Sequence, residues 1–367
     1  MKIRVLEKHT MCIVGEDYQL VPREDPSLEF SRGPLMGGRF GLSLFMSTPR
    51  RVVPIIIISS LLVCCILYYT SPMSATAVFA PSATSERNGL PSAKTEAYPK
   101  RLRFRGTQRR LPQALIIGVR KCGTRALLEM LNLHPRVRKN GNEMHFFDVD
   151  ERYANGIEWY RKKMPYSFDN QVTVEKTPSY FVSREAPARV RAMNESTRLL
   201  LIVREPAIRV LSDYTQIMDS KLKKGVKVPQ FHEKVLTPEG EVNDGYKAIK
   251  ISQYAVHLLH WLREFPLDQI HIIDGDNLIV DPFTEIDKVQ RFLRLPPHIT
   301  AENFYFNETK GFYCMRNETF QKCLAESKGR PHPQVDPVVM SRLRKFFAPF
   351  NEQFYEMVGR NFSWPTS

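Results

Sequence analysis

The sequence predicts an α/β fold in which helices flank a central parallel sheet. Short strand-like runs, of which residues 198–203 are almost entirely apolar, alternate with amphipathic stretches, which is typical of strands that helices cover on both faces. The apolar runs lie at residues 114–119, 171–176, 198–203 and 269–274. Because ligands of such sheets bind beyond the carboxyl ends of the strands, functional residues are expected just after these runs.

Helices are expected between and after these strands. Residues 124–133 follow the first strand directly and are amphipathic. A second helix is expected from about Pro206 to Met218, with proline in its first turn, where no backbone donor is needed. A third is expected at about 247–265, before the last strand. With 43% hydrophobic residues in a chain of 367, the sequence can form a large folded core.

One transmembrane helix is expected before this domain. Residues 52–69 are 18 residues without a charge, which is the lower limit for a membrane span. The long segment before them argues against a cleaved signal peptide, and a buried core helix remains the alternative. Lys and Arg are frequent before the run, whereas only Arg87 occurs in residues 70–93. The positive-inside rule therefore predicts that residues 1–51 form a cytoplasmic tail and that the rest lies in the lumen.

Residues 70–110 are predicted to form a flexible stem, and residues 111–367 a lumenal domain. The stem is rich in Ser, Ala, Pro and Thr up to residue 99 and ends in a basic run. Four N-x-[ST] sequons follow the span and are candidate glycosylation sites in a lumenal protein. They are at Asn194, Asn307, Asn317 and Asn361.

The positive charge of the chain belongs to its folded part. The net charge is +14, and residues 100–367 contain 43 Lys or Arg against 31 Asp or Glu. This excess indicates either a solvated basic surface or a groove for a polyanion. Nucleic acid is not expected as a partner in the secretory lumen, so an acidic glycan is the favoured polyanion.

The cysteines agree with an oxidising compartment. Cys12 precedes the span, Cys64 and Cys65 lie within it, and Cys122 lies in a glycine-bearing loop. Cys314 and Cys323 remain as the plausible disulfide pair. Two cysteines without partner ligands at suitable spacing do not indicate a zinc site.

The stretch "IIGVRKCGTRALLEML" (116–131) predicts a strand, a phosphate-binding turn and a helix. Gly118 and Gly123 have the spacing of the loop G-x-x-x-x-G-K-[ST], but Lys121 precedes the second glycine and Thr124 follows it directly. The arrangement that serves the β- and γ-phosphates of a nucleoside triphosphate is therefore missing. A nucleotide with one phosphate at its 5′ end fits such a loop. A tight turn with an incidental lysine is the alternative.

A second anion site is expected in "IVREPAIRVLSDY" (202–214). Arg204 ends a buried strand, and Ser212 lies about two helical turns later. Together they suit a second phosphate on the same nucleotide. Alternatively, Arg204 forms a salt bridge with Glu205 or Asp213.

The segment "EMHFFD" places two carboxylates and a histidine close together in the sequence. A carboxylate among apolar and basic neighbours, such as Glu143, can be tuned to accept a proton. His145 and Asp148 follow at spacings of two and five. Glu-x-His is also typical of metal sites, but a third ligand is missing, so no metal is expected. The strand end "HIID" (271–274) resembles a magnesium site, which leaves a kinase as an alternative.

These motifs resemble those of the heparan sulfate glucosamine 3-O-sulfotransferases, most closely the type 1 and type 5 group. The similar segments cover residues 111–364 in family order, and Cys122 departs from the glycine that is usual in close relatives. The resemblance implies a sulfotransferase-type P-loop fold. The segments are "GVRKCGTRALLEMLNLHP", "NEMHFFD", "GIEWYRKKMP", "VEKTPSYF", "IVREPAIRVLSDYTQ", "KGFYC" and "KGRPHPQVDP".

The resemblance also implies a role for individual residues. It assigns the catalytic base to Glu143, beside His145 and Asp148, assigns catalytic roles to Lys121 and Lys176, and matches Cys314 and Cys323 to the family disulfide. The residues implied to bind the nucleotide are Lys121, Cys122, Gly123, Thr124, Arg125, Arg204, Ser212, Tyr313, Lys328, Gly329, Arg330, Pro331 and His332. Those implied to bind the glycan are Glu143, Met144, His145, Phe146, Phe147, Asp148, Lys176, Thr177, Pro178, Ser179 and Gln216.

The implied activity is transfer of a sulfuryl group from 3′-phosphoadenosine 5′-phosphosulfate to the 3-hydroxyl of glucosamine in heparan sulfate, with no metal. The implied location is the Golgi membrane, as a single-pass type II protein with a lumenal catalytic domain. Two alternatives remain open at this point. One is a P-loop glycan kinase, and the other is a heparin-binding glycoprotein that has lost catalysis.

Overall fold

The computed structural model describes residues 10–14, 17–21, 104–325 and 331–367. The chain divides into two units, residues 1–100 and 101–367. In the first unit, β1 (Thr10–Val14) pairs antiparallel with β2 (Asp17–Val21). The expected span at 52–69 and nearly all of the expected stem lie outside the described residues. Within the described ranges, no helix is both long and apolar enough to cross a membrane.

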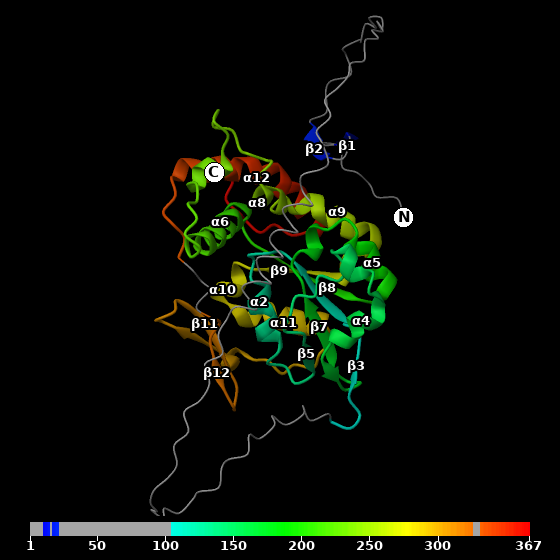
Figure 1. The fold of residues 1–367 in the computed structure, drawn as a ribbon. Coiled ribbons are helices and arrows are strands. Elements are labelled where there is room, and N and C mark those ends of the chain that lie inside the picture. Colours follow the sequence, from blue (N-terminus) through cyan, green and yellow to red (C-terminus); the bar gives the residue numbers. More distant parts are fainter. Residues whose placement is uncertain (1–9, 15–16, 22–103, 326–330) are drawn as a thin grey trace, which may run out of the picture. The chain divides into compact units, whose positions relative to one another are not determined.

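A five-stranded sheet forms the centre of the second unit (Figure 1). Its order is β5-β7-β4-β8-β9, and every neighbouring pair is parallel. The prediction of a parallel sheet is thus confirmed, although β5, which contains a single apolar residue, was not expected. The strands are β4 (Ala114–Gly118), β5 (Val137–Lys139), β7 (Val172–Lys176), β8 (Arg198–Val203) and β9 (Ile270–Asp274).

Helices cover the central strands on both faces. Every residue of β4, and every residue of β8 except Arg198, is buried, although successive side chains point to opposite faces. One group of helices contains α2 and α11, which contact each other, and a second contains α9, which contacts α5 and α12. Their bounds are α2 (Thr124–Leu131), α5 (Ala186–Met193), α9 (Tyr254–Glu264), α11 (Pro282–Phe292) and α12 (Pro337–Val358).

The expected second helix is confirmed as α6 (Pro206–Leu222), which runs one turn further than predicted. The expectation of one helix at 247–265 is wrong, because α8 (Lys247–Ile251) ends before α9 begins. Arg209, fully buried on α6, lies against the break. Its Nε donates to Ser252 Oγ and its Nη2 to Ala248 O, at 2.5 and 2.6 Å. These contacts join α6 to the C-terminal end of α8.

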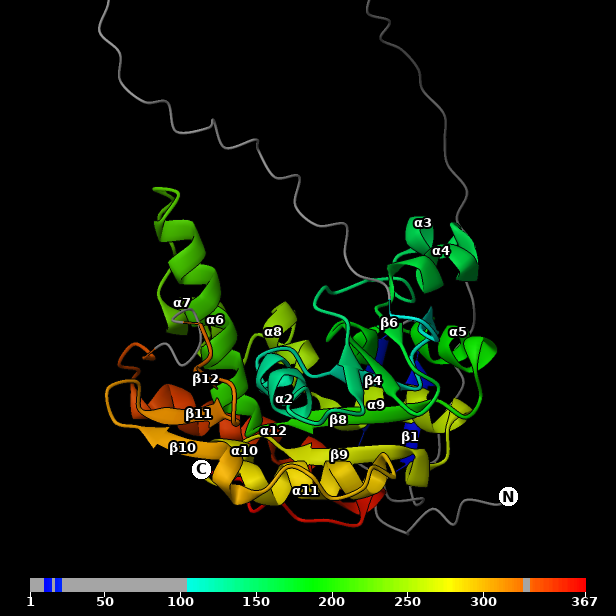
Figure 2. The same cartoon turned by 90° about the horizontal axis from the view of Figure 1, so that it is seen from below.

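A small antiparallel sheet, β10-β11-β12, lies beside α10 (Figure 2). A disulfide joins Cys314 on β11 to Cys323, which directly follows β12. The strands are β10 (Phe304–Asn307), β11 (Phe312–Arg316) and β12 (Gln321–Lys322). The remaining elements are β3 (Gln108–Arg109), α3 (Asp150–Tyr153), α4 (Gly156–Lys163), β6 (Tyr166–Ser167), η1 (Tyr180–Val182), α7 (Phe231–Val235), η2 (Leu267–Gln269), α10 (Asn277–Val280) and η3 (Ala301–Asn303).

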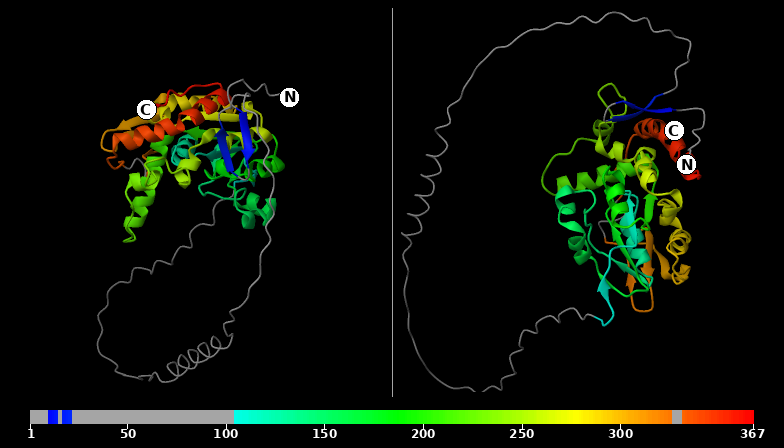
Figure 3. Two further views of the ribbon diagram at one scale, coloured as in Figure 1. Left: turned by 90° about the horizontal axis from the view of Figure 1, so that it is seen from above. Right: turned by 90° about the vertical axis from the view of Figure 1, so that its right-hand side faces the viewer.

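Two apolar clusters hold the elements together. The larger surrounds the sheet, and the smaller packs α6 against α12 through residues such as Val210, Leu343 and Phe347. Figure 3 shows α12 in orange to red. These contacts fix α6, and hence one wall of the functional site, to the body of the domain.

Gly275, directly after β9, lies where three backbone segments converge. A Cβ at this position would lie 2.5 Å from Cys122 O, 2.7 Å from Val203 O and 2.7 Å from Arg204 Cγ. We expect Gly275→Ala to lower the free energy of unfolding by roughly 1–3 kcal/mol, because the backbone must shift to make room. Thermal unfolding measures the effect. Gly141→Ala is the control, since a Cβ there meets nothing within 4 Å; equal melting temperatures for both variants would contradict the close approach.

Candidate active site

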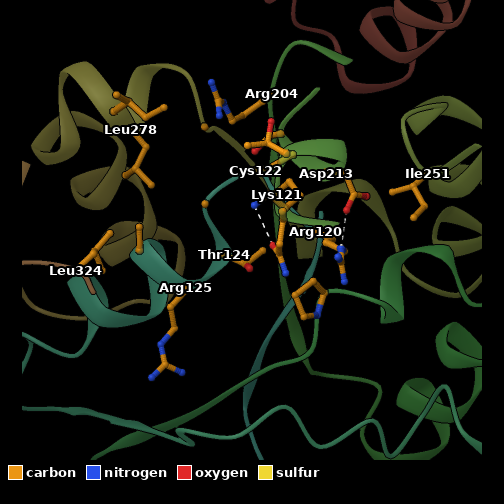
Figure 4. Close-up of a pocket in the computed structure, with 18 of the residues that line it drawn as sticks. Arg120, Lys121, Cys122, Thr124, Arg125, Arg204, Asp213, Ile251, Leu278 and Leu324 are labelled. Carbon is orange, nitrogen blue, oxygen red and sulfur yellow. Dashed lines mark hydrogen bonds and ion pairs between the residues drawn. The ribbon is translucent and has the colours of Figure 1, made fainter. Parts of the chain in front are cut away.

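A cavity of about 1130 Å³ opens beyond the carboxyl ends of four parallel strands (Figure 4). Lys121, Lys176, Arg204 and Gly275 lie at or just after the ends of β4, β7, β8 and β9, and all line it. The predicted site residues that line the cavity are Lys121, Cys122, Gly123, Thr124, Arg125, Glu143, His145, Lys176, Pro178, Ser179, Arg204, Ser212, Gln216, Tyr313 and His332. The sheet thus brings together most of the residues that the sequence singled out.

The loop between β4 and α2 forms one end of the cavity. Lys121 and Gly123 adopt left-handed φ values of 77° and 109°, and a glycine suits the second. No side chain caps the N-terminus of α2. The dipole and the uncapped N–H groups of a helix start favour an anion. Lys121 Nζ, which donates to Gln216 Oε1 at 3.0 Å, adds positive charge.

Arg204 adds a positive charge to the cavity at the end of β8. Its Nε lies 2.7 Å from Asp276 Oδ1, so the expected alternative of a salt bridge to Glu205 or Asp213 is wrong. Glu205 pairs with Arg344 instead. Burial lowers the pKa of Arg204, but the Asp276 carboxylate outweighs it and raises that pKa above its usual value. Arg204 therefore remains a fixed cation in the cavity wall.

A second basic side chain was missed by the sequence reasoning. Arg120, directly before Lys121, lines the cavity, and its Nε lies 3.1 Å from Asp213 Oδ1 (Figure 4). Ser212, next to this aspartate on α6, lines the cavity as predicted. The carboxyl-end rule would have found Arg120, because it directly follows the first predicted strand.

A connected row of side chains runs from Lys176 to Asp148. Lys176 Nζ pairs with Glu143 Oε1, and Glu143 Oε2 lies 3.7 Å from His145 Nε2. His145 Nδ1 lies 3.0 Å from Asp148 Oδ2, and Ser179 Oγ hydrogen-bonds to both. The Lys176 side chain is 5% exposed and that of Glu143 43%. Glu143 is therefore the carboxylate of this row that an acceptor in the cavity can reach.

The other predicted site residues lie elsewhere. Asp148 and Pro331 do not line the cavity, and Lys328, Gly329 and Arg330 lie outside the described residues. The remaining predicted glycan-binding residues are buried behind the cavity wall, where they support the Glu143 loop. They are Met144, Phe146, Phe147 and Thr177.

The strand end "HIID" does not form an open magnesium site. Asp274 Oδ1 accepts the N–H groups of Asp276 and Asn277, both at 3.0 Å, and Asp274 Oδ2 lies 3.2 Å from Arg360 Nη2. Across the described residues, no group of three or more His, Cys, Asp or Glu side chains is arranged to hold a metal ion. These contacts of Asp274 count against the kinase alternative.

The predicted sequons occupy surface positions for the most part. Asn194, Asn317 and Asn361 are exposed, and Asn307 is half-buried. Their glycosylation stays a prediction.

Cys122 lies in the loop between β4 and α2, residues 119–123, but its thiol points into the core. It is 1% exposed, and its Sγ lies 3.6 Å from Tyr254 OH. Burial raises the pKa of Cys122 to about 11. The thiol therefore takes no part in chemistry at neutral pH.

We expect Cys122 in the native protein to resist iodoacetamide at pH 8, because burial raises the pKa of its thiol and also covers the sulfur. Peptide mass spectrometry measures the labelling. The same protein unfolded in guanidinium is the control and should be labelled. Rapid labelling of Cys122 in the native protein would contradict the burial.

Comparison with known proteins identifies similar sequences and folds. A family model described as "Sulfotransferase domain" matches residues 111–358. Heparan sulfate glucosamine 3-O-sulfotransferase 5 of Homo sapiens is 53% identical over 274 residues, which cover 74% of this chain and 79% of that protein. Heparan sulfate glucosamine 3-O-sulfotransferase 3B1 of Homo sapiens is 45% identical over 300 residues, covering 80% and 75%.

A solved structure shares the fold. The sulfotransferase from Alicyclobacillus acidocaldarius superposes with a TM-score of 0.51 and 17% identity, covering 69% of this chain and 98% of that one. At this identity the likeness shows the fold alone, which agrees with the predicted central parallel sheet and flanking helices.

Proposed function

The chain belongs to the heparan sulfate glucosamine 3-O-sulfotransferase family, as its motifs predict, and we propose that it transfers a sulfuryl group from 3′-phosphoadenosine 5′-phosphosulfate to the 3-hydroxyl of glucosamine in heparan sulfate. One observation supports this most directly. Two anion sites, the α2 N-terminus and Arg204, share a cavity with the reachable carboxylate of Glu143. A nucleotide that carries a 5′-phosphosulfate and a 3′-phosphate needs two such sites, and its acceptor needs a base.

The side chains of the cavity have different roles in the transfer. Glu143 takes the proton of the sugar hydroxyl as the hydroxyl oxygen forms its bond to sulfur. The bond between sulfur and the bridging oxygen breaks, and the electron pair stays on the departing 3′,5′-bisphosphate. Lys121 and Lys176 stabilise the negative charge that develops on the bridging oxygen and the transferred group. The contacts of His145 with Glu143 and Asp148 orient this part of the cavity for the acceptor.

The two alternatives fit less well. A kinase would use the carboxylate of Asp274, which is occupied by two backbone N–H groups and Arg360. A protein that had lost catalysis would be expected to lack part of the reacting set, yet Glu143, Lys121 and Lys176 all line the cavity.

The location and the finer chemistry rest on the sequence. We propose that residues 52–69 anchor the protein in the Golgi membrane and that its catalytic domain is lumenal and glycosylated. We also propose that the transfer needs no metal. The net positive charge of residues 100–367 supports a long acidic glycan as partner.

We expect Glu143→Gln to lower kcat by about 10²–10⁴-fold, because a general base contributes that much. Calorimetry should show 3′,5′-bisphosphate binding within about twofold of the parent. Glu158→Gln is the control, since the Glu158 side chain is 64% exposed on α4. A glutamine variant at 143 with nearly normal kcat would show that another group is the base.

We expect Arg204→Ala to weaken binding of the 3′,5′-bisphosphate nucleotide by roughly 1.5–3 kcal/mol, which is the worth of a charge-assisted hydrogen bond. Binding of the same nucleotide without its 3′-phosphate should change much less. Calorimetry measures the affinity of Arg204→Ala and of the parent protein for each of the two nucleotides, and the two losses of affinity are then compared. Equal losses for the two ligands would remove Arg204 from the 3′-phosphate site.

A further inference from the structure

Glu175 is a fully buried carboxyl that the reaction itself does not use. It lies on β7 directly before Lys176, and its side chain has no exposed surface. Since neighbouring side chains of a strand point to opposite faces, Lys176 reaches the cavity while Glu175 lies in the core. Buried carboxyls are costly unless several donors surround them.

Donors surround both oxygens of Glu175. Oε1 accepts from Thr177 Oγ1 at 2.5 Å and from Met144 N at 3.3 Å. Oε2 accepts from Tyr160 OH at 3.2 Å. Burial raises the pKa of Glu175 to about 7, and these hydrogen bonds, with one from Tyr180, limit the rise.

The same cluster holds three consecutive backbone N–H groups. Because the Thr177 hydroxyl donates its proton to Glu175, its oxygen lone pairs accept from Met144 N at 3.0 Å and His145 N at 3.4 Å. Tyr180 OH accepts from Phe146 N at 3.1 Å. The backbone of residues 144–146 is thereby held by three side chains, those of Glu175 on β7, Thr177, and Tyr180 in η1.

This segment needs such fixing. His145 has a φ of 49°, in the left-handed region that residues other than glycine rarely adopt. Glu143 lies directly before the three residues whose N–H groups are held. The side chains of Glu143 and His145 line the cavity. A loop with one strained residue keeps its shape only when its surroundings determine it.

We propose that Glu175 is a positioning residue for sulfuryl transfer: by orienting the Thr177 hydroxyl and accepting from Met144 N, it holds the loop that presents Glu143 and His145 to the acceptor. The inference rests on the proposed function for its kinetic part only, because the shape of the loop can be measured without turnover. Glu175 is buried and does not line the cavity, and the loop between β4 and α2 and Arg204 belong to other elements.

Three variants of the full-length protein separate this role from general stability. Glu175→Ala removes both acceptor oxygens, whereas Glu175→Gln keeps one oxygen for Met144 N and Thr177 and turns its amide toward Tyr160. Thr177→Val removes the hydroxyl without changing side-chain size. Gln290→Ala is the matched control, since Gln290 is also buried and holds the backbone N–H groups of His298 and Ile299, which do not line the cavity.

The kinetic readout is the split between kcat and nucleotide affinity. We expect Glu175→Ala and Thr177→Val to lower kcat per folded molecule about 10²-fold, the order of effect of a misplaced catalytic group. Affinity for the 3′,5′-bisphosphate should stay within about twofold of the parent. Glu175→Gln should recover most of the lost kcat, and Gln290→Ala should lower the melting temperature while keeping kcat. If Glu175→Ala fails to fold, Glu175→Gln and Thr177→Val still make the comparison.

Amide hydrogen exchange of residues 143–147, measured without substrates, gives the second readout. Exchange should be faster in Glu175→Ala and Thr177→Val than in the parent and in Gln290→Ala. Unchanged exchange, normal kcat in these variants, or a glutamine variant no better than alanine would overturn the positioning role. An inactive parent protein would instead contradict the proposed function, while the exchange comparison would still decide the role of Glu175.

Discussion

The parallel direction of four neighbouring strands is the constraint on which the site depends. Because β7, β4, β8 and β9 run the same way, the residues at or directly after their ends meet at one edge of the sheet. Lys176, Lys121 and Arg204 come from three of these ends and supply positive charge to one cavity, and Asp276, after the fourth end, pairs with Arg204. Gly275 allows the closest approach, since any side chain there would meet the backbone of two neighbouring segments.

Buried polar groups behind the cavity wall keep these strand ends and loops in place. The guanidinium of Arg209 on α6 donates to Ser252 Oγ and Ala248 O, and so joins α6 to α8. It also donates to Asp213 and to Arg120 O, and so joins α6 to the loop between β4 and α2. Glu175 accepts hydrogen bonds from Met144 N and the Thr177 hydroxyl, and so joins β7 to the loop that carries Glu143. Removing one partner from a buried ion pair such as Arg209–Asp213 costs about 3–5 kcal/mol, because the other charge is left without its counterpart. Arg209 and Glu175, which do not line the cavity themselves, therefore help to determine its geometry.

Local sequence pattern was sufficient to predict four of the five parallel strands, and with them the edge of the sheet where the cavity lies. It could not reveal β5, because Val137–Lys139 has one apolar residue. The partner of Arg204 could not be predicted either, since nearer carboxylates compete and Asp276 is brought in only by the strand order. Glu175 reads as an ordinary polar residue in "VEKTPSYF", because burial depends on the helices that close over β7. Residue types thus indicated the chemistry, whereas the supporting contacts required the fold.

Product analysis tests the central claim most directly. The full-length protein is incubated with heparan sulfate and either 3′-phosphoadenosine 5′-phosphosulfate labelled in its sulfuryl group or ATP labelled in its γ-phosphate, and the chains are then cleaved to disaccharides. The account predicts label from the sulfate donor alone, on the 3-oxygen of glucosamine. Label from ATP, label at another position of the sugar, or glycan binding without any transfer would contradict it.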